Sequence, residues 1–258
     1  MKAHIETFGR YKYLLKNLIV KDVKLKYRRS ILGILWSVLN PLLMMIVISA
    51  VFSSIFKIKV ENFPIYYLTG STLFNMLSET TSSSMMSVLD SSSLIKKVYI
   101  PKYIFPLEKC MFGFINFLFS MIAVAIMFLI FKYPVHLTVL LFPIPVFYTL
   151  VFSVGLGLIL SAVSVFFRDI IHLYSVLLVA WNYLTPIVYP YDILSNEMKG
   201  IMQFNPMFHY VQYFRDVLMY NTVPGIEENL ICIAMAFATL IIGLLFFKKR
   251  QDNFILYI

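Results

Sequence analysis

The residue types that carry catalysis and metal binding occur in this sequence without the spacing that either activity requires. A GxxxxGK[ST] phosphate-binding loop, an HExxH zinc motif and a cysteine–histidine array with metal-ligand spacing are absent. Cys110 and Cys232 lie in apolar runs, where a buried small side chain is more common than a disulfide or a metal pair. The histidines are scattered and are interpreted as interfacial residues: His4, His136, His172 and His209. The sequence therefore predicts a protein that is not an enzyme and binds no metal.

Glu79 is the candidate for an ionisable residue inside a membrane span, where it could take part in ion or proton transfer. It follows the run Asn62–Ser78 and precedes the serine and threonine tract Thr80–Ser84. An ionisable residue inside a membrane commonly marks an ion or proton path, but a carboxylate near the end of a span also bonds to neighbouring hydroxyl groups. Because a proton-coupled carrier needs a fuller relay, the sequence favours the interfacial interpretation and disfavours a secondary transporter.

These sparse polar residues belong to a strongly apolar chain. Hydrophobic residues make up 60% of the 258 residues and charged residues 14%, and the mean hydropathy is +0.82, which is typical of a membrane protein. The net charge of +9 could indicate nucleic acid, but in so apolar a chain it indicates anionic lipid and loop topology. The first 30 residues lack the apolar core of a secretory signal. We predict an integral membrane protein with no nucleic acid partner.

Residues 11–29 carry apolar and basic side chains, each at helical spacing. The apolar face comprises Tyr11, Leu14, Leu15 and Leu18, and the basic face continues through Lys21, Lys24 and Arg28. Residues 31–56 contain no charged residue at all. We predict residues 1–30 as an N-terminal amphipathic interface helix on the cytoplasmic surface, with a short join at Ser30 to the first span.

Charge-free runs predict an all-α membrane protein with six transmembrane helices, since about 20 apolar residues cross the hydrocarbon. The predicted spans, within one domain over residues 31–258, are about 31–56, 63–86, 110–131, 139–167, 171–190 and 229–247. The second is more polar, and a re-entrant element is the alternative there. The remaining residues are too few for a nucleotide-binding domain, so an ATPase that drives transport would be a separate polypeptide.

The distribution of lysine and arginine predicts the orientation of these spans. Six spans place both termini on one side, and 17 of the 22 basic residues then fall on that side. By the positive-inside rule, both termini are cytoplasmic. Arg168 and Asp169 divide an otherwise continuous apolar stretch, so we predict a tight hairpin at the membrane edge; contact with an ATPase or with lipid phosphates is the alternative for this pair.

Two connections are too long to be simple turns. The cytoplasmic one, residues 90–109, has a serine-rich start, a short amphipathic piece and then two prolines. The external one, residues 190–228, is too rich in apolar and aromatic residues for a solvated loop. We predict that it forms two short re-entrant helices between spans five and six, broken at Pro206; an amphipathic loop lying flat on the outer surface is the alternative.

Five segments, in order along the chain, carry a resemblance to a known family. They are YRRSILGILWSVLNPLL (27–43), IKKVYIPKYIFPL (95–107), VFFRDI (165–170), TPIVYP (185–190) and QFNPM (203–207). Each motif alone is weakly specific, but the ordered set is similar to the membrane subunit of ABC-2 type polysaccharide exporters. The likeness extends over nearly the whole chain, including its length and its six predicted spans.

The resemblance implies a homodimer bound to two copies of a separate ABC ATPase in the bacterial cytoplasmic membrane. A lipid-linked polysaccharide of the O-antigen, teichoic acid or capsule type would pass between the two subunits. This chain would bind no cofactor, because ATP and Mg²⁺ would sit on the partner ATPase. In such exporters, short helices before the last span form an external gate, which corresponds here to Phe204, Asn205 and Pro206.

Aromatic residues are the candidates for a channel that conducts sugars, because sugar C–H faces stack on aromatic rings. The candidates are Trp36, Tyr174, Trp181 and Tyr183. The alternative is the ordinary enrichment of tryptophan and tyrosine at membrane interfaces.

The cytoplasmic connection between spans two and three is the candidate for ATPase coupling. The predicted contact residues are Lys96, Lys97, Tyr99, Pro101 and Lys102. For the lysines, ordinary positive-inside charge is an equally good explanation. The basic side of the N-terminal helix is predicted to contact the same ATPase, with lipid on its apolar side.

Other function classes fit the sequence less well. An ABC-2 type permease for a drug or lipid commonly carries a large external insertion, which is absent here. A membrane-embedded glycosyl or acyl transferase would need clustered acidic or histidine residues at a membrane face. A secondary carrier is disfavoured further because the two halves of the chain show no evident repeat.

Overall fold

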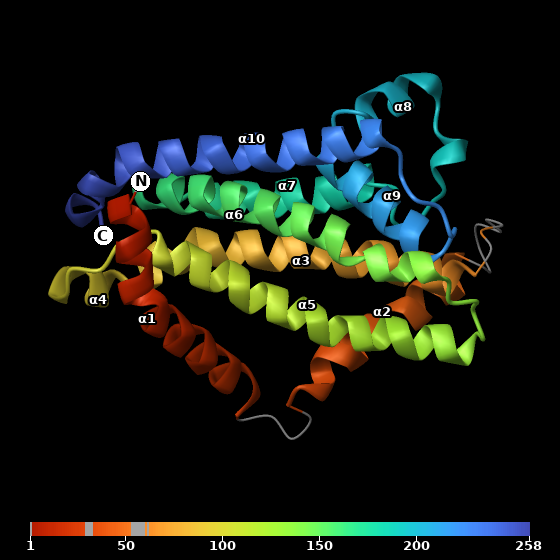
Figure 1. The fold of residues 1–258 in the computed structure, drawn as a ribbon, viewed down its shortest axis with the longest axis horizontal. Helices are drawn as coiled ribbons and strands as arrows, with labels where there is room; N and C mark the ends of the chain where they lie inside the picture. Colours follow the sequence, from red (N-terminus) through yellow and green to blue (C-terminus); the bar gives the residue numbers. More distant parts are fainter. Residues whose placement is uncertain (1, 29–32, 53–59, 61) are drawn as a thin grey trace.

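The computed structural model describes residues 2–28, 33–52, 60 and 62–258, and the described chain is built from helices (Figure 1). The helices are α1 (Lys2–Tyr27), α2 (Leu35–Val51), α3 (Phe63–Asp90), α4 (Ser92–Lys97), α5 (Ile104–Ile130), α6 (Pro143–Phe166), α7 (Ile170–Leu184), α8 (Asn196–Met202), α9 (Pro206–Leu218) and α10 (Ile226–Arg250). Short 3-10 helices cover Leu137–Leu141, Tyr191–Ile193 and Gln251–Leu256.

Each predicted span coincides with one of the long helices, namely α2, α3, α5, α6, α7 and α10. Three segments are long and apolar enough to cross a membrane by length and composition: Ile104–Ile130, Leu137–Phe166 and Ile226–Leu256. Leu35–Val51 and Ile170–Leu184 are apolar but shorter. Residues 31–32 and 53–56 of the first predicted span, and the predicted join at Ser30, lie outside the described residues.

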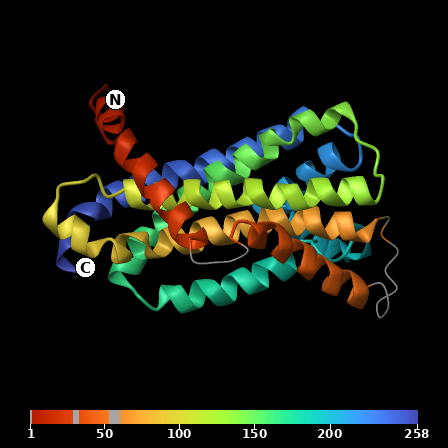
Figure 2. The ribbon, with the colours of Figure 1, turned by 90° about the horizontal axis from the view of Figure 1, so that it is seen from below.

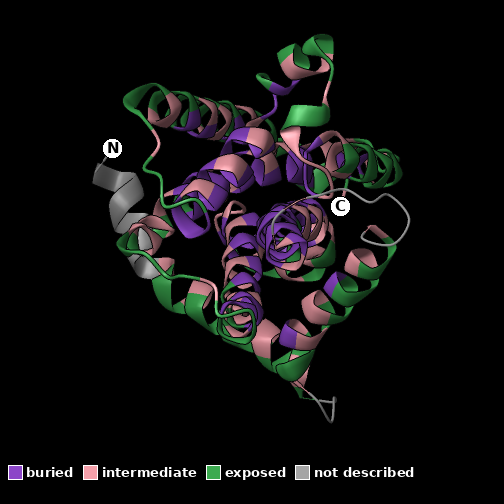
Figure 3. Cartoon of the chain, turned by 90° about the vertical axis from the view of Figure 1, so that its right-hand side faces the viewer, coloured by how far each residue is buried: buried purple, intermediate pink, exposed green. Residues whose placement is uncertain are grey.

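Helix α3 occupies the centre of the bundle although it is the most polar of the long helices after α1. Most of its residues are buried, and it packs most extensively on α5 and α6. Figure 3 shows that the buried residues gather at the centre of the bundle. Its buried threonine hydroxyls donate to carbonyls of the preceding turn, at 2.9 Å from Thr69 to Ile65, 2.8 Å from Thr72 to Leu68 and 2.7 Å from Thr81 to Leu77. These bonds satisfy the threonine hydroxyls within α3 itself, so these side chains can be buried without an acceptor on a neighbouring helix.

Glycines let α5 and α6 approach α3 closely. A Cβ atom at Gly113 of α5 would lie 2.6 Å from the Thr80 methyl group, and one at Gly157 of α6 would lie 2.9 Å from Ser84. Across the same contacts, the Ser84 hydroxyl donates to the Pro106 carbonyl at 3.0 Å. Small residues thus bring the three helices together as they do in other membrane bundles.

Helices α6 and α10 cross at a second close contact. A Cβ atom at Gly155 would lie 2.5 Å from the backbone of Thr239 and Leu240, and Gly243 faces Gly155 from α10. Because backbone atoms cannot move aside like the end of a flexible side chain, this contact requires glycine.

The predicted hairpin at Arg168 and Asp169 is present. Helix α6 ends at Phe166 and α7 begins at Ile170. The Asp169 carbonyl accepts hydrogen bonds from the backbone of His172 and Leu173, both at 3.1 Å. The two charged residues are exposed in the turn.

Helix α1 runs obliquely across the bundle (Figure 2). Its predicted apolar face, Tyr11, Leu14, Leu15 and Leu18, packs on a hydrophobic cluster of this chain. We call this the second cluster; its buried members are Val88, Ile95, Ile100, Ile104, Phe105, Leu158, Ala162, Val165, Phe247 and Phe254. The prediction that this face contacts lipid is therefore wrong, because α1 buries it against its own protein.

At the opposite end of the bundle from both termini, α8 and α9 form the two short helices predicted before the last span, with the break at Pro206 (Figure 1). Arg215 of α9 is fully buried. Its guanidinium donates to the carbonyls of Pro186 at 2.7 Å, Tyr66 at 3.0 Å and Ile187 at 3.2 Å. It also stacks over the Tyr66 ring at 3.5 Å, so one side chain joins α9 to α3 and to the segment after α7.

We predict that Gly155→Ala destabilises the fold by about 1–3 kcal/mol, since the added methyl group overlaps the α10 backbone. The measurement is the thermal unfolding of the detergent-solubilised protein. The matched control is Gly200→Ala in α8, where nothing lies within 4 Å of the new methyl group. Alanine favours a helix over glycine, so this control should not lower the melting temperature, and equal losses in both variants would contradict the close contact.

Candidate functional site

The accessible face of α3 is a polar stripe. Its members recur three, four, seven and eight residues apart: Asn75, Ser78, Glu79, Ser82 and Ser83, with Asp90 at the end of the helix. The rest of α3 is largely buried. Since polar groups are costly in hydrocarbon, this face requires either water or a partner.

The stripe forms one wall of a cavity of about 710 Å³, which we call the polar groove. Its lining residues come from four helices and are Lys26, Trp36, Ser37, Asn40, Pro41, Asn75, Ser78, Glu79, Ser82, Ser83, Asn116 and Ser120. Most of them carry a hydroxyl, an amide or a charge.

Glu79 anchors the network along the groove. Its Oε1 accepts from the Asn116 amide at 2.6 Å and pairs with Lys26 Nζ at 2.9 Å. The side chains of Lys26 and Glu79 are 39% and 36% exposed, so water screens the ion pair and it contributes at most about 1 kcal/mol. The predicted partners of Glu79, neighbouring serine and threonine hydroxyls, are replaced here by a lysine and an amide, and its interfacial position stays a prediction.

Tyr27, the last residue of α1, joins α1 to α2 and α5. Its hydroxyl donates to Asn116 Oδ1 at 2.9 Å and lies 2.7 Å from the Ser37 hydroxyl. Because the tyrosine proton goes to Asn116, Ser37 is the donor in the second bond. Ser120 donates to the Ser37 carbonyl at 3.2 Å. The four helices around the groove are therefore linked by side-chain hydrogen bonds.

A second cavity, of about 380 Å³, continues from the groove. It shares Ser82 and Ser83 with the groove and extends along α3 past Met86 to Asp90, with Lys109 and Phe112 opposite. The polar surface thus reaches the end of α3 that leads into α4.

The polar side chains of the groove can bind a ligand through hydrogen bonds. Hydroxyl and amide groups donate and accept hydrogen bonds with a hydroxylated or hydrated ligand. Among the residues that the structure describes, no group of three or more histidine, cysteine, aspartate or glutamate side chains could hold a metal ion.

The four predicted channel aromatics do not come together. Trp36 lines the polar groove and is 48% exposed. Tyr174 is instead buried, because its hydroxyl donates to Thr81 of α3 at 2.6 Å, so it lines no open surface and that prediction is wrong for this chain. Tyr183 is 67% exposed on α7. Trp181 lies next to the predicted gate.

The predicted gate residues form a compact corner between α7 and α9. Asn205 caps α9, since its Oδ1 accepts from the Met207 amide at 3.0 Å, and it also accepts from Trp181 Nε1 at 2.7 Å. Its Nδ2 donates to the Thr185 hydroxyl at 3.1 Å. Pro206 starts α9, and Phe204 is 85% exposed. A largely apolar cavity of about 490 Å³ lies beside this corner.

The predicted coupling residues fall into two groups. Lys96 and Lys97 end α4 and are exposed, as is Tyr99 at 92%. Pro101 and Lys102 are half-buried, and Lys102 Nζ donates to the Gln251 carbonyl at 2.6 Å. Burial lowers the pKa of the Lys102 ammonium group, and the negative charge of Asp252 opposes this. Lys102 therefore contacts the C-terminal residues of its own chain.

The serines and asparagines of the groove were not predicted as site residues. A signal was present, because Asn75, Ser78, Ser82 and Ser83 share one helical face in the sequence. The sequence alone does not show that Asn116 and Ser120 lie opposite that face.

Comparisons with known proteins agree with this architecture. The family described as ABC-2 type transporter matches residues 13–219. The chain is 28% identical to the O-antigen export system permease protein RfbA of Klebsiella pneumoniae, over 94% of this chain and 95% of that protein. It is 28% identical to the protein of the same name from Myxococcus xanthus, over 95% of each. It is 22% identical to the polysialic acid transport protein KpsM of Escherichia coli, over 93% of this chain and 95% of that protein.

We predict that Tyr27→Phe costs about 0.5–1.5 kcal/mol of stability, because it leaves Asn116 and Ser37 without their shared partner. Denaturant unfolding in detergent measures this. Tyr13→Phe is the control, since the Tyr13 side chain is 78% exposed on the same helix and its change should stay within about 0.5 kcal/mol. Indistinguishable midpoints would show that the bridge contributes nothing.

Proposed function

Because the chain belongs to the ABC-2 type transporter family, we propose that it is the membrane subunit of an ATP-driven exporter. Its cargo is a lipid-linked polysaccharide of the O-antigen, teichoic acid or capsule type, and its location is the bacterial cytoplasmic membrane. The names of the similar proteins support this class of cargo. The observation that carries the proposal is the polar groove along α3 in an otherwise apolar chain.

The chemistry of the groove suits a sugar polymer. Sugars present hydroxyl groups, which the serine hydroxyls and asparagine amides of the groove can bond, and C–H faces, which the half-exposed Trp36 ring can stack on. None of these contacts is deeply enclosed. A shallow polar surface favours a polymer that moves through over a ligand that is held tightly.

In the proposed topology, six helices cross the membrane: α2, α3, α5, α6, α7 and α10. Both termini and α4 are cytoplasmic, and α8 and α9 dip back into the outer half of the membrane. Support comes from the positive-inside count and from the position of both chain ends at one end of the bundle, opposite α8 and α9 (Figure 1).

The exporter would contain two copies of this chain. The polar groove is open on one side, and α2 and α7 carry exposed apolar residues: Leu43, Met44, Ile46 and Val47 on α2, and Leu173, Val176, Leu177 and Val179 on α7. A second copy packed on these faces would turn two open grooves into one enclosed path away from lipid.

A separate ATPase, present in two copies and holding ATP and Mg²⁺, would drive export. Lys96, Lys97 and Tyr99 offer it an exposed surface with both charge and apolar area. Pro101 and Lys102 would instead hold this surface in place through the contact of Lys102 with Gln251. At the other end, Phe204, Asn205 and Pro206 would form the external gate, tied to α7 through Trp181.

We predict that Ser82→Trp abolishes export, because Ser82 lines both the polar groove and the cavity that continues from it, so the indole ring would occupy the region that the two share. The test is performed in a strain that lacks the chromosomal copy and any redundant exporter. Without the protein, lipid-linked glycan should accumulate on the cytoplasmic side, and wild type should restore surface glycan. Ser82→Trp should leave surface glycan at background level while the protein is present at the normal amount.

The control for this experiment is Ile241→Trp, which places the same ring on the exposed side of α10, where Ile241 is 55% exposed. It should restore surface glycan fully. Normal surface glycan in the deletion strain itself would overturn the proposed cargo. Full export by Ser82→Trp would remove the groove from the path.

We predict that Lys96→Glu combined with Lys97→Glu weakens binding of the partner ATPase by about tenfold, the scale expected when two exposed charges are reversed. Copurification and titration with the purified ATPase measure this. The control is Lys248→Glu with Lys249→Glu, which reverses two exposed charges at the same end of the bundle (Figure 1). Equal losses in the two variants would indicate a general charge effect rather than a docking surface.

A further inference from the structure

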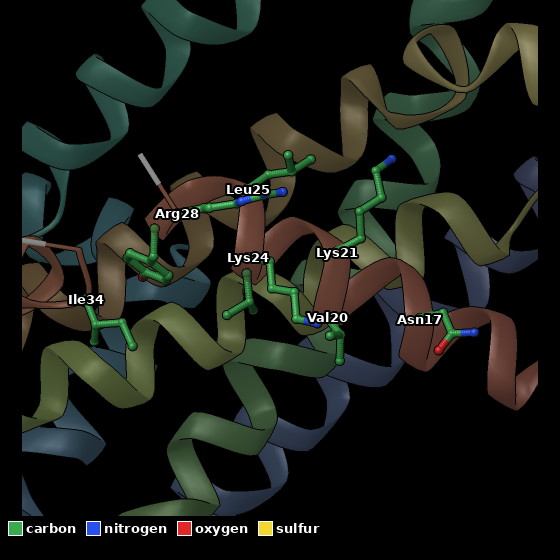
Figure 4. A pocket seen from close by; sticks show the side chains of 9 residues that line it. Asn17, Val20, Lys21, Lys24, Leu25, Arg28 and Ile34 are labelled. Carbon is green, nitrogen blue, oxygen red and sulfur yellow. The ribbon is translucent and has the colours of Figure 1, made fainter. Parts of the chain in front are cut away.

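A further cavity lies along the second half of α1, apart from the polar groove. It has a volume of about 940 Å³. Its lining residues are Asn17, Val20, Lys21, Val23, Lys24, Leu25, Tyr27, Arg28 and Ile34 (Figure 4). We call it the α1 cavity.

Three cations on the α1 cavity have no acidic partner. Lys21, Lys24 and Arg28 are spaced three and four residues apart and therefore share one face of the helix. Among the described residues, none of their side chains forms an ion pair. In contrast, Asp22 and Lys26 point elsewhere and are paired with Lys109 and Glu79. The α1 cavity thus concentrates positive charge that forms no ion pair within the part of the chain that the structure describes.

Apolar side chains stand beside these charges. Val20, Leu25 and Ile34 line the same cavity and are 39%, 61% and 44% exposed. The opposite, apolar face of α1 already packs on the second cluster, so these three residues are not part of that contact. A ligand that fits both features has an anionic group and a hydrocarbon part.

The position of the α1 cavity indicates where that ligand comes from. Ile34 immediately precedes α2, which enters the membrane in the proposed topology. The α1 cavity would therefore lie at the inner membrane surface, where phosphate headgroups and the first methylene groups of acyl chains are found.

We propose that the α1 cavity binds an anionic membrane phospholipid. The phosphate contacts Lys21, Lys24 and Arg28, and an acyl chain lies along Val20, Leu25 and Ile34. The inference rests on the proposed membrane topology but not on the identity of the cargo. It replaces the sequence-based prediction that the ATPase contacts the basic side of this part of α1.

An ATPase contact is less consistent with the geometry. The candidate coupling surface meets α1 at its other half, where the Tyr11 hydroxyl donates to the Tyr99 carbonyl at 3.3 Å. Thirteen residues of helix separate Tyr11 from Lys24, which corresponds to about 20 Å. A protein docked at α4 would have to extend this distance along the membrane surface to cover the three cations.

The test is native mass spectrometry of the solubilised protein with phosphatidylglycerol and phosphatidylcholine of equal chain length. The wild-type protein should retain phosphatidylglycerol in preference to phosphatidylcholine. Lys21→Gln with Lys24→Gln should weaken this binding by about 25-fold, or about fivefold for each lysine near an anionic headgroup. Lys21→Arg with Lys24→Arg keeps the charge and should retain the lipid.

The matched control is Lys12→Gln with Lys16→Gln, which removes two exposed lysines from the same helix outside the α1 cavity. It should retain phosphatidylglycerol like wild type. Equal loss in both double variants, or no loss in either, would overturn the proposal. Displacement of the lipid by millimolar glycerol phosphate would show a site for free phosphate instead. Loss of the ATPase with the lipid still bound would show a protein surface. None of these measurements depends on export, so their failure is distinguishable from failure of the proposed function.

Discussion

The structure depends on burying a polar helix inside an apolar protein. Helix α3 can occupy the centre because its buried threonine hydroxyls, such as those of Thr72 and Thr81, bond to its own backbone, while the buried Ser84 hydroxyl bonds to the Pro106 carbonyl of α5. Glycines at positions 113 and 157 then allow α5 and α6 to close on it. The remaining polar residues of α3 lie on the face that α5 and α6 do not cover, so their side chains are accessible. They form the polar groove, so the packing of α3 and the polar groove have the same origin.

The groove also explains why α1 ends where it does. Lys26 and Tyr27 close the helix with bonds to Glu79, Asn116 and Ser37. These partners belong to three different helices of the groove. A surface helix without such anchors would be held only by its apolar face, whereas this one is also fixed at its C-terminal end. The wall of the groove and the end of α1 are therefore one hydrogen-bonded unit.

Composition and charge-free runs predicted the elements well, because a membrane span is specified by local hydropathy. The helices at every predicted span, the turn at Arg168 and the two short helices around Pro206 needed no knowledge of tertiary contacts. It was harder to predict which surface each helix face contacts. The apolar face of α1 has the same spacing whether it meets lipid or the second cluster, so periodicity alone could not decide. Tyr174 is an aromatic residue of the type that could line a channel, but its hydroxyl donates to Thr81, a buried partner 93 residues away in the sequence. The groove was missed because its opposite walls come from α2, α3 and α5.

Helix α1 contacts both the segment beside α4 and the polar groove, which in the proposed exporter are the coupling surface and the cargo path. Near one end, Tyr11 contacts the backbone of Tyr99 beside α4, and neighbouring leucines pack on the cluster that also holds Phe254 of the C-terminal residues. At the other end, Tyr27 joins the groove. Tyr11 and Tyr27 lie 16 positions apart on one uninterrupted helix, which corresponds to about 24 Å. A continuous helix transmits displacement because its backbone hydrogen bonds resist bending. Movement at the cytoplasmic connection would therefore reach the groove through α1, and a lipid in the α1 cavity would set the surface along which that helix moves.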